Sequence, residues 1–124
     1  MRILITGGTT FVSKFVSEYF VSKGSEVTVL NRGSRPQSFG VSLIQCDRTQ
    51  LSESLKGIDF DVIIDITAYT EEHIRTLIES GVAFHDYIFI SSSAVYYITL
   101  QLIISYFHGY FQSYFFGNTK SRRA

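Results

Sequence analysis

Short apolar runs alternate with mixed polar stretches over the first 90 residues of the chain. Five runs have the length and the β-branched content of strands: 2–6, 26–30, 41–46, 60–66 and 86–90. The first run is apolar after Arg2, as a parallel strand buried on both faces would be. After the first run, apolar side chains recur at the spacing of one helical face, at Val12, Phe15, Val16, Tyr19 and Phe20. Strands that alternate with helices in this way predict an α/β fold with a parallel sheet.

Two further helices are expected between the later runs. Leu51 and Leu55 allow only a short helix between the third and fourth runs. Thr70 can cap a second helix, which has acidic residues in its first turn and a buried face of Ile74, Leu77 and Ile78. Because crossovers between parallel strands are right-handed, these helices would cover both faces of the sheet. We therefore expect a Rossmann-like, doubly wound parallel sheet in a three-layer α/β/α arrangement.

Composition narrows the class of protein. The chain has 124 residues, about one domain, and eleven basic side chains balance eleven acidic ones, so neither a disordered tail nor a broadly basic nucleic-acid binder is expected. Cys46 is the single cysteine, which excludes an internal disulfide, and the chain opens on a strand-like run without a targeting segment. These features favour a cytoplasmic protein that binds neither nucleic acid nor a membrane.

Residues 98–124 have a different composition from residues 1–97, since they contain three basic side chains, no acidic one and many Tyr and Phe residues. We divide the chain accordingly into a domain over 1–97 and an atypical aromatic tail over 98–124, which a frameshift or truncation of the coding sequence would produce. If the tail is genuine, the helical spacing of aromatic residues from Tyr106 to Tyr114 favours a homodimer that buries them.

Gly7 and Gly8 stand between the first strand-like run and the first helix. Glycine lets the backbone approach a pyrophosphate closely, and the N–H groups at the start of the helix, over Thr10, Phe11 and Val12, would face the phosphates. A tight strand-to-helix turn without a ligand also uses glycine, but its place directly after an N-terminal strand favours a dinucleotide site.

Five blocks occur in unbroken order over residues 1–97: ITGGTTFVS at 5–13, VLNRG at 29–33, CDR at 46–48, DVIID at 61–65 and FISSSAVY at 89–96. Together they resemble the NAD-dependent epimerase/dehydratase family, the extended short-chain dehydrogenases/reductases. The resemblance implies a Rossmann-like domain and an NAD(P) cofactor. Of the three motif glycines of the family only Gly7 is kept, because Thr10 and Ser13 occupy the other two places.

The resemblance also implies roles for residues that follow the other strands. Asn31 and Arg32 replace the acidic ribose ligand of the family, and a guanidinium there favours the 2′-phosphate of NADP over NAD, unless the arginine is only a solvated loop charge. Asp47 would lie beside the adenine amine, or would merely cap the short helix that follows it. The inner ribose of the cofactor would be lined by Ile66, Thr67 and Ala68.

The serine run after the fifth strand would carry part of the chemistry. By resemblance Ser92 is the catalytic serine and Ser93 its neighbour, the hydroxyl binding the substrate oxygen; an ordinary polar turn is the alternative. The family also needs a Tyr and a Lys four positions apart, with the Lys lowering the pKa of the phenol. We expect no such pair in this chain, and after the serine run Phe116 and Lys120 have the spacing without the phenol.

Two functions stay open. The first is an NAD(P)-dependent epimerase/dehydratase or reductase-like protein that acts on a sugar-nucleotide-like hydroxyl compound, with this chain as its N-terminal portion. The second is a dinucleotide-binding module without the acid/base pair and so without turnover. No metal is expected, because His73, His85 and His108 share no metal-ligand spacing.

Overall fold

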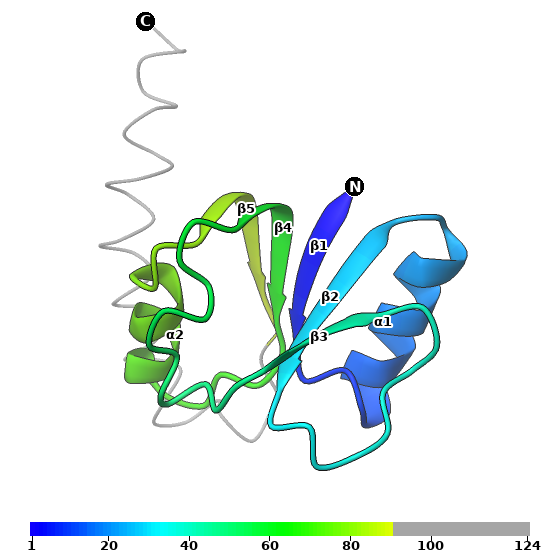
Figure 1. Cartoon of the computed structure of the whole chain (residues 1–124), viewed down its shortest axis with the longest axis horizontal. Coiled ribbons are helices and arrows are strands. Elements are labelled where there is room, and N and C mark those ends of the chain that lie inside the picture. Colours follow the sequence, from blue (N-terminus) through cyan, green and yellow to red (C-terminus); the bar gives the residue numbers. More distant parts are fainter. Residues whose placement is uncertain (91–124) are drawn as a thin grey trace, which may run out of the picture. The chain divides into compact units, whose positions relative to one another are not determined.

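A computed structural model describes residues 1–90 as a five-stranded parallel sheet with two helices (Figure 1). The strand order is β3-β2-β1-β4-β5, with β1 at the centre. The elements follow one another as β1 (Arg2–Thr6), α1 (Phe11–Ser22), β2 (Glu26–Asn31), β3 (Ser42–Gln45), β4 (Asp59–Asp65), α2 (Glu71–Ile78) and β5 (Ala83–Phe89). The predicted Rossmann-like parallel sheet is confirmed.

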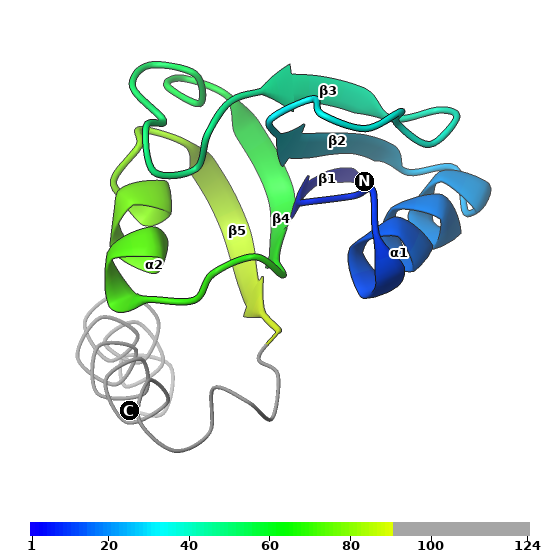
Figure 2. The same cartoon turned by 90° about the horizontal axis from the view of Figure 1, so that it is seen from below.

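The two helices lie on opposite faces of this sheet (Figure 2). On the α1 face, the buried side chains of the strands form a cluster of Ile3, Ile5, Val27, Val29 and Ile64. On the α2 face, Leu55, Ile63, Ile74 and Leu77 are fully buried. Both sides of the central strands are therefore covered, which explains why their sequences read as unbroken apolar runs.

Helix α1 packs on the sheet through two buried serines together with the partly buried side chains of Val16, Phe20 and Val21. Ser13 and Ser17 are buried, and each hydroxyl donates to the carbonyl three residues earlier, at 2.8 Å. The small side chains let the helix lie close to the sheet. Of the predicted stripe, Val16 and Phe20 are partly buried, whereas three members are exposed by 48–71%: Val12, Phe15 and Tyr19. The predicted helix is therefore present, but its apolar stripe is only partly buried.

Two further expectations differ from the structure. The short helix predicted around Leu51 and Leu55 is a series of turns, although both leucines are buried. Ser52 has a positive φ of 50°, a left-handed conformation that cannot continue an α-helix. Strand β5 begins at Ala83 rather than at residue 86. Among the described strands it lies at an edge of the sheet, where polar residues such as His85 are tolerated, so the apolar pattern missed its first residues.

The chain divides into two compact units. The first contains residues 1–68 and 72–91, and the second contains 69–71 and 92–124. The predicted boundary at residue 97, and the predicted homodimer contact of the tail, lie outside the described residues and stay predictions. Within residues 1–90, no helix is long and apolar enough to cross a membrane.

Candidate functional site

The turn between β1 and α1 requires glycine at both positions of the Gly7-Gly8 pair. Both residues have positive φ angles, 94° and 98°. A Cβ atom on Gly7 would come within 3.0 Å of the Ser13 hydroxyl, and one on Gly8 within 2.6 Å of a Val29 methyl group. Larger residues are therefore excluded by both conformation and packing.

Unpaired backbone donors follow the glycine pair. The Gly7 N–H donates to Leu30 O at 2.9 Å, and the first intrahelical bond runs from Lys14 N to Thr10 O at 3.2 Å. Between them, no described residue accepts a hydrogen bond from the backbone N–H groups of residues 8–13. A run of unpaired donors at the start of a helix is a suitable place for phosphate oxygens.

The first residues of α1 have an unusual geometry. Thr10 is the N-cap residue, with an extended backbone but no capping hydrogen bond from its side chain. Phe11 follows with a positive φ of 42° and is 93% exposed. Val12 is also exposed. Left-handed backbone at a phenylalanine is sterically unfavourable, and such strain occurs preferentially at binding sites.

Asn31, the last residue of β2, ties two loops together. Its Nδ2 donates to Gly7 O at 2.7 Å and to Gln37 Oε1 at 2.9 Å, while its Oδ1 accepts from Gly33 N at 2.8 Å. The side-chain amide thus connects the glycine turn to the loop after β2, and its donors are already engaged within the protein.

Arg32 and Arg35 lie on the exposed loop after Asn31. Within the described part of the chain, neither guanidinium forms an ion pair or donates a hydrogen bond. Arg32 contributes only its backbone carbonyl, which accepts from Gln45 Nε2 at 3.2 Å. Two guanidinium groups are therefore available to an anion beside the glycine turn.

Asp47 follows β3 and is oriented by Thr49. Its Oδ1 accepts from the Thr49 hydroxyl at 2.6 Å and from the Thr49 N–H at 2.8 Å. These two hydrogen bonds lower the pKa of Asp47 below its ordinary value of 3.8, so the group is a carboxylate at neutral pH. No described residue donates to Oδ2, which leaves this atom for an amine of a ligand.

The segment after β4 is held by a buried threonine of β1. The Thr6 hydroxyl accepts from the N–H groups of Ile66 and Thr67, at 2.9 and 3.1 Å, and donates to Asp65 Oδ1 at 2.8 Å. Ala68 is buried. The methyl group of Thr67 would lie 3.1 Å from a Cβ atom on Gly7, so this segment and the glycine turn are in contact.

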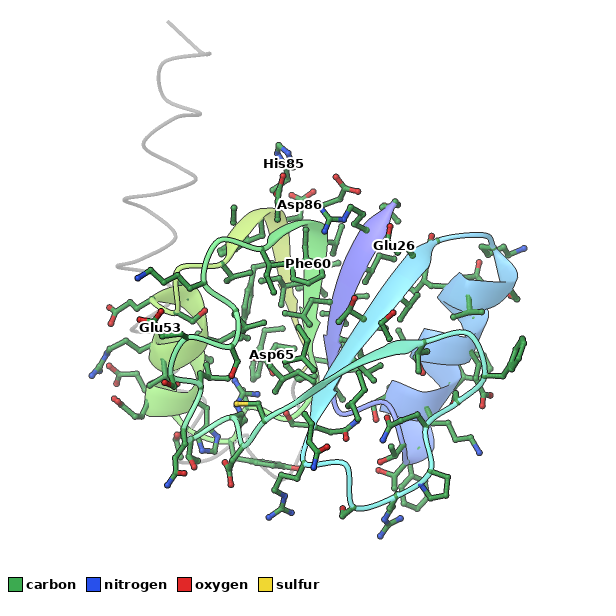
Figure 3. The ribbon with its side chains drawn as sticks, viewed as in Figure 1. Glu26, Glu53, Phe60, Asp65, His85 and Asp86 are labelled. Atoms are coloured by element: carbon green, nitrogen blue, oxygen red, sulfur yellow. The ribbon has the colours of Figure 1, made fainter. Side chains whose placement is uncertain are left out.

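A buried ion pair, not anticipated from the sequence, links three of these segments. Arg48 binds Asp65 through two bonds, Nη1 to Oδ1 at 2.6 Å and Nη2 to Oδ2 at 2.9 Å. The Tyr87 hydroxyl also donates to Asp65 Oδ2. Figure 3 shows Asp65 toward the carboxyl ends of the strands, away from Glu26, His85 and Asp86, which lie toward their amino ends. An Asp directly after the apolar run 62–64 of β4 was the signal available in the sequence.

Both side chains of this ion pair are buried. The Asp65 side chain is fully buried and that of Arg48 is 10% exposed. Burial alone would lower the pKa of Arg48, but the hydrogen bonds and charge of Asp65 raise it. Burial and the neighbouring carboxylate raise the pKa of Tyr87 well above its ordinary 10.0, so its hydroxyl keeps its proton and donates.

The predicted catalytic residues Ser92 and Ser93 lie outside the described residues, as do Phe116 and Lys120. A Tyr-x-x-x-Lys spacing does occur once, at Tyr19 and Lys23, so the expectation that the chain lacks it altogether is wrong. The Lys23 amine lies 5.5 Å from the centre of the Tyr19 ring. This pair is at the C-terminal end of α1, whereas the glycine turn is at the N-terminal end, so it is not an acid/base pair for that site.

The comparisons with known proteins agree with this geometry. The NAD dependent epimerase/dehydratase family matches residues 3–96, which is most of the chain. The chain belongs to this family.

Within residues 1–90, no group of three or more His, Cys, Asp or Glu side chains is placed to hold a metal ion.

Two similar proteins extend the comparison. A curated relative, the chloroplast stem-loop binding protein of 41 kDa b of Arabidopsis thaliana, is 31% identical over 113 residues; the match covers 77% of this chain and 30% of that protein. Vestitone reductase from alfalfa (Medicago sativa) has a similar structure, with a TM-score of 0.58, 16% identity, and coverage of 75% of this chain and 36% of that one. The chain thus spans about a third of the length of these proteins.

The residues present fit a dinucleotide. The glycine turn offers unpaired N–H groups for a pyrophosphate, Asp47 offers a carboxylate oxygen for an amine, and Arg32 offers a cation for a further phosphate. These groups belong to turns after β1, β2 and β3, all at the carboxyl ends of strands, where parallel α/β sheets bind their ligands.

Proposed function

We propose that this chain binds NAD(P) along the carboxyl ends of its strands. The pyrophosphate lies against residues 7–12, the adenine amine donates to Asp47, and the inner ribose lies against Ile66, Thr67 and Ala68. The observation that carries this proposal is the run of backbone N–H groups over residues 8–13 without an acceptor among the described residues. Membership of the epimerase/dehydratase family supports the same cofactor class.

We further propose that NADP is preferred over NAD. An acidic residue at the end of β2 would accept hydrogen bonds from both ribose hydroxyls of NAD. Asn31 stands there instead, and its amide donors are engaged with Gly7 and Gln37. Arg32, directly after it, is exposed and has no partner for its guanidinium within residues 1–90. A guanidinium suits the doubly charged 2′-phosphate that only NADP carries.

Titration of the full chain with NADPH and NADH, followed by the fluorescence of the reduced nicotinamide, tests both proposals. Arg32→Glu replaces attraction by repulsion at the 2′-phosphate, so NADPH affinity should fall by about tenfold or more while NADH affinity changes little. Lys56→Glu is the matched control, because it reverses an exposed charge whose partner is Glu53. Absence of binding by the wild-type chain would refute the site, and an unchanged NADPH/NADH ratio in Arg32→Glu would refute the preference.

For the reaction, we propose oxidation and reduction of a hydroxyl compound of the sugar-nucleotide type by a longer protein of this family. The nicotinamide supplies hydride transfer when it is bound, and Ser92 with Ser93 would bind the reacting oxygen. The alternative is a binding module without turnover, since no Tyr-x-x-x-Lys pair follows the serine run. Incubation of a longer protein that contains this chain with NADP+ and UDP- or GDP-sugars separates the two. Only the first function converts the sugar, with NADPH absorbance where the hydride stays on the nicotinamide and an altered sugar product where the hydride returns to the substrate.

Nucleic-acid binding is a second candidate function because the curated relative is named for stem-loop binding. Residues 1–90 carry eight basic and eleven acidic side chains, and the charge of Arg48 is already paired with that of the buried Asp65. This charge balance disfavours phosphate-backbone binding, so we retain the prediction of no nucleic-acid partner. An electrophoretic shift of an RNA hairpin by the chain, lost at high salt, would overturn this prediction.

The cytoplasmic location also stays a prediction. The curated relative is chloroplastic by its name, so its location does not support the prediction.

A further inference from the structure

Arg48 follows Asp47 in the chain and anchors that residue to other parts of the site. Its Nη1 donates to Thr67 Oγ1 at 3.0 Å in addition to Asp65, and its Nη2 donates to His73 O at 2.8 Å. One guanidinium therefore contacts the end of β4, the segment after β4 and α2. These contacts fix the backbone beside Asp47 relative to Thr67.

Asp65 extends this connection to the central strand. Each of its oxygens accepts two hydrogen bonds: Oδ1 from Thr6 and Arg48, and Oδ2 from Arg48 and Tyr87. Thr6 in turn accepts from the N–H groups that begin the segment after β4. The carboxyl ends of β1, β3 and β4 are thus joined through a single buried cluster.

Stability alone does not account for such an arrangement. Removing two charges from water offsets most of their attraction, and apolar residues of similar size frequently stabilise a protein as well or better. The Nε atom of Arg48 is buried without a hydrogen-bond partner among the described residues, a further unfavourable contribution. What the planar, forked guanidinium supplies and apolar side chains lack is a fixed direction toward four acceptors.

We propose that Arg48 is a positioning residue for the dinucleotide: it holds the adenine-binding Asp47 at a fixed place relative to the ribose-binding Thr67. This inference rests on the proposed function, because it concerns how that same site is ordered. Arg48 itself does not touch the cofactor in this proposal, since its Nη donors are engaged within the protein.

A double-mutant cycle on NADPH affinity tests the proposal with the full chain. Arg48→Lys keeps the positive charge but cannot reproduce the two parallel bonds to Asp65. It should weaken NADPH binding by about tenfold in the wild-type background. In an Asp47→Ala background the same change should weaken binding by about twofold or less, because the residue it positions is gone. If Arg48→Lys does not fold, Thr67→Val removes one acceptor of the guanidinium and takes its place in the cycle.

Arg2→Met is the matched control, because it removes an exposed arginine whose partner is Glu26. Both residues lie at the amino ends of the strands, away from the candidate site. It should leave NADPH affinity unchanged. Amide hydrogen exchange supplies a readout that needs no ligand. In Arg48→Lys, exchange should accelerate at Thr49 and Thr67, whose N–H groups are bonded within the site, and not at Glu26, which is bonded to Met1 O.

The outcomes separate the two proposals. A wild-type chain that binds neither dinucleotide overturns the proposed function and this inference with it. A wild-type chain that binds NADPH, combined with equal effects of Arg48→Lys in both backgrounds, overturns this inference alone. Unchanged exchange at Thr49 and Thr67 in Arg48→Lys also overturns it, since the two segments would then be ordered without the guanidinium.

Discussion

Thr10 allows folding and phosphate binding to be changed in opposite directions by one substitution. It is the N-cap residue of α1, its backbone is extended as an N-cap requires (φ −140°, ψ 146°), and its side chain forms no capping hydrogen bond. Aspartate is among the best N-cap residues, and its charge is favourable at a helix N-terminus. Thr10→Asp should therefore preserve or increase the stability of the chain, yet it places a carboxylate where we propose the pyrophosphate.

The magnitudes of the two effects are separable. A new capping bond contributes about 0.5–2 kcal/mol and the interaction of the charge with the helix dipole about 0.3–1 kcal/mol. Against this, two unit charges 4 Å apart repel by about 1 kcal/mol in water and about 4 kcal/mol near a protein surface. A tenfold change in affinity corresponds to about 1.4 kcal/mol, so NADPH binding should weaken between fivefold and several hundredfold.

Thr10→Asn is the matched control, because asparagine caps as well as aspartate but carries no charge. Urea unfolding of the three proteins measures stability, and NADPH fluorescence titration at low and high salt measures affinity. We expect both variants to be at least as stable as the wild type, and only Thr10→Asp to lose affinity, less so at high salt. Equal NADPH affinities of Thr10→Asp and Thr10→Asn would show that no phosphate lies at this helix terminus.

The packing of α1 and the buried hydroxyl of Tyr87 give two further predictions. Phe15→Glu should change the free energy of unfolding by no more than about 0.5 kcal/mol, because the side chain is 71% exposed. Ser17→Val should destabilise the chain by about 1–3 kcal/mol, because it adds methyl groups where no surface is exposed. Urea unfolding that ranks the two variants the other way would contradict the observed helix face. The raised pKa of Tyr87 means that its stabilisation is complete below pH 10.0 and is lost as pH rises toward the folded-state value. Tyr87→Phe should be less stable at neutral pH by about 1.5–3 kcal/mol, through loss of a donor to a buried carboxylate, and should lose less further stability above pH 10; parallel stability–pH curves would refute this.

The positions of the strands along the chain and of the glycine turn could be predicted because both leave a local mark. A strand covered on both faces must be apolar throughout, as in Arg2–Thr6 after its first residue, and a backbone with φ near 94° at residue 7 strongly favours glycine. The helix face could not be predicted in the same way. Phe15 and Ser17 lie on α1 two residues apart, and apolarity alone points to the wrong one.

The buried ion pair had even less local signal. Arg48 and Asp65 are 17 residues apart, and charged residues at the ends of strands are solvent-exposed in most proteins. Neither residue has a reason to be buried until the other is present to compensate its charge. Their roles in the candidate site therefore depended on the arrangement of β3 and β4 around β1.

By itself, the amino-acid sequence determined the class of fold and the family, because apolar runs and glycine turns are properties of short segments. It also predicted the end of the sheet at which we propose that a dinucleotide binds. Only the tertiary structure decided that α1 buries Ser13 and Ser17 against the sheet and that Asn31, Arg48 and Asp65 are engaged within the protein. Close packing and hydrogen-bond pairing are relations between distant segments, and their geometry exists only once those segments meet.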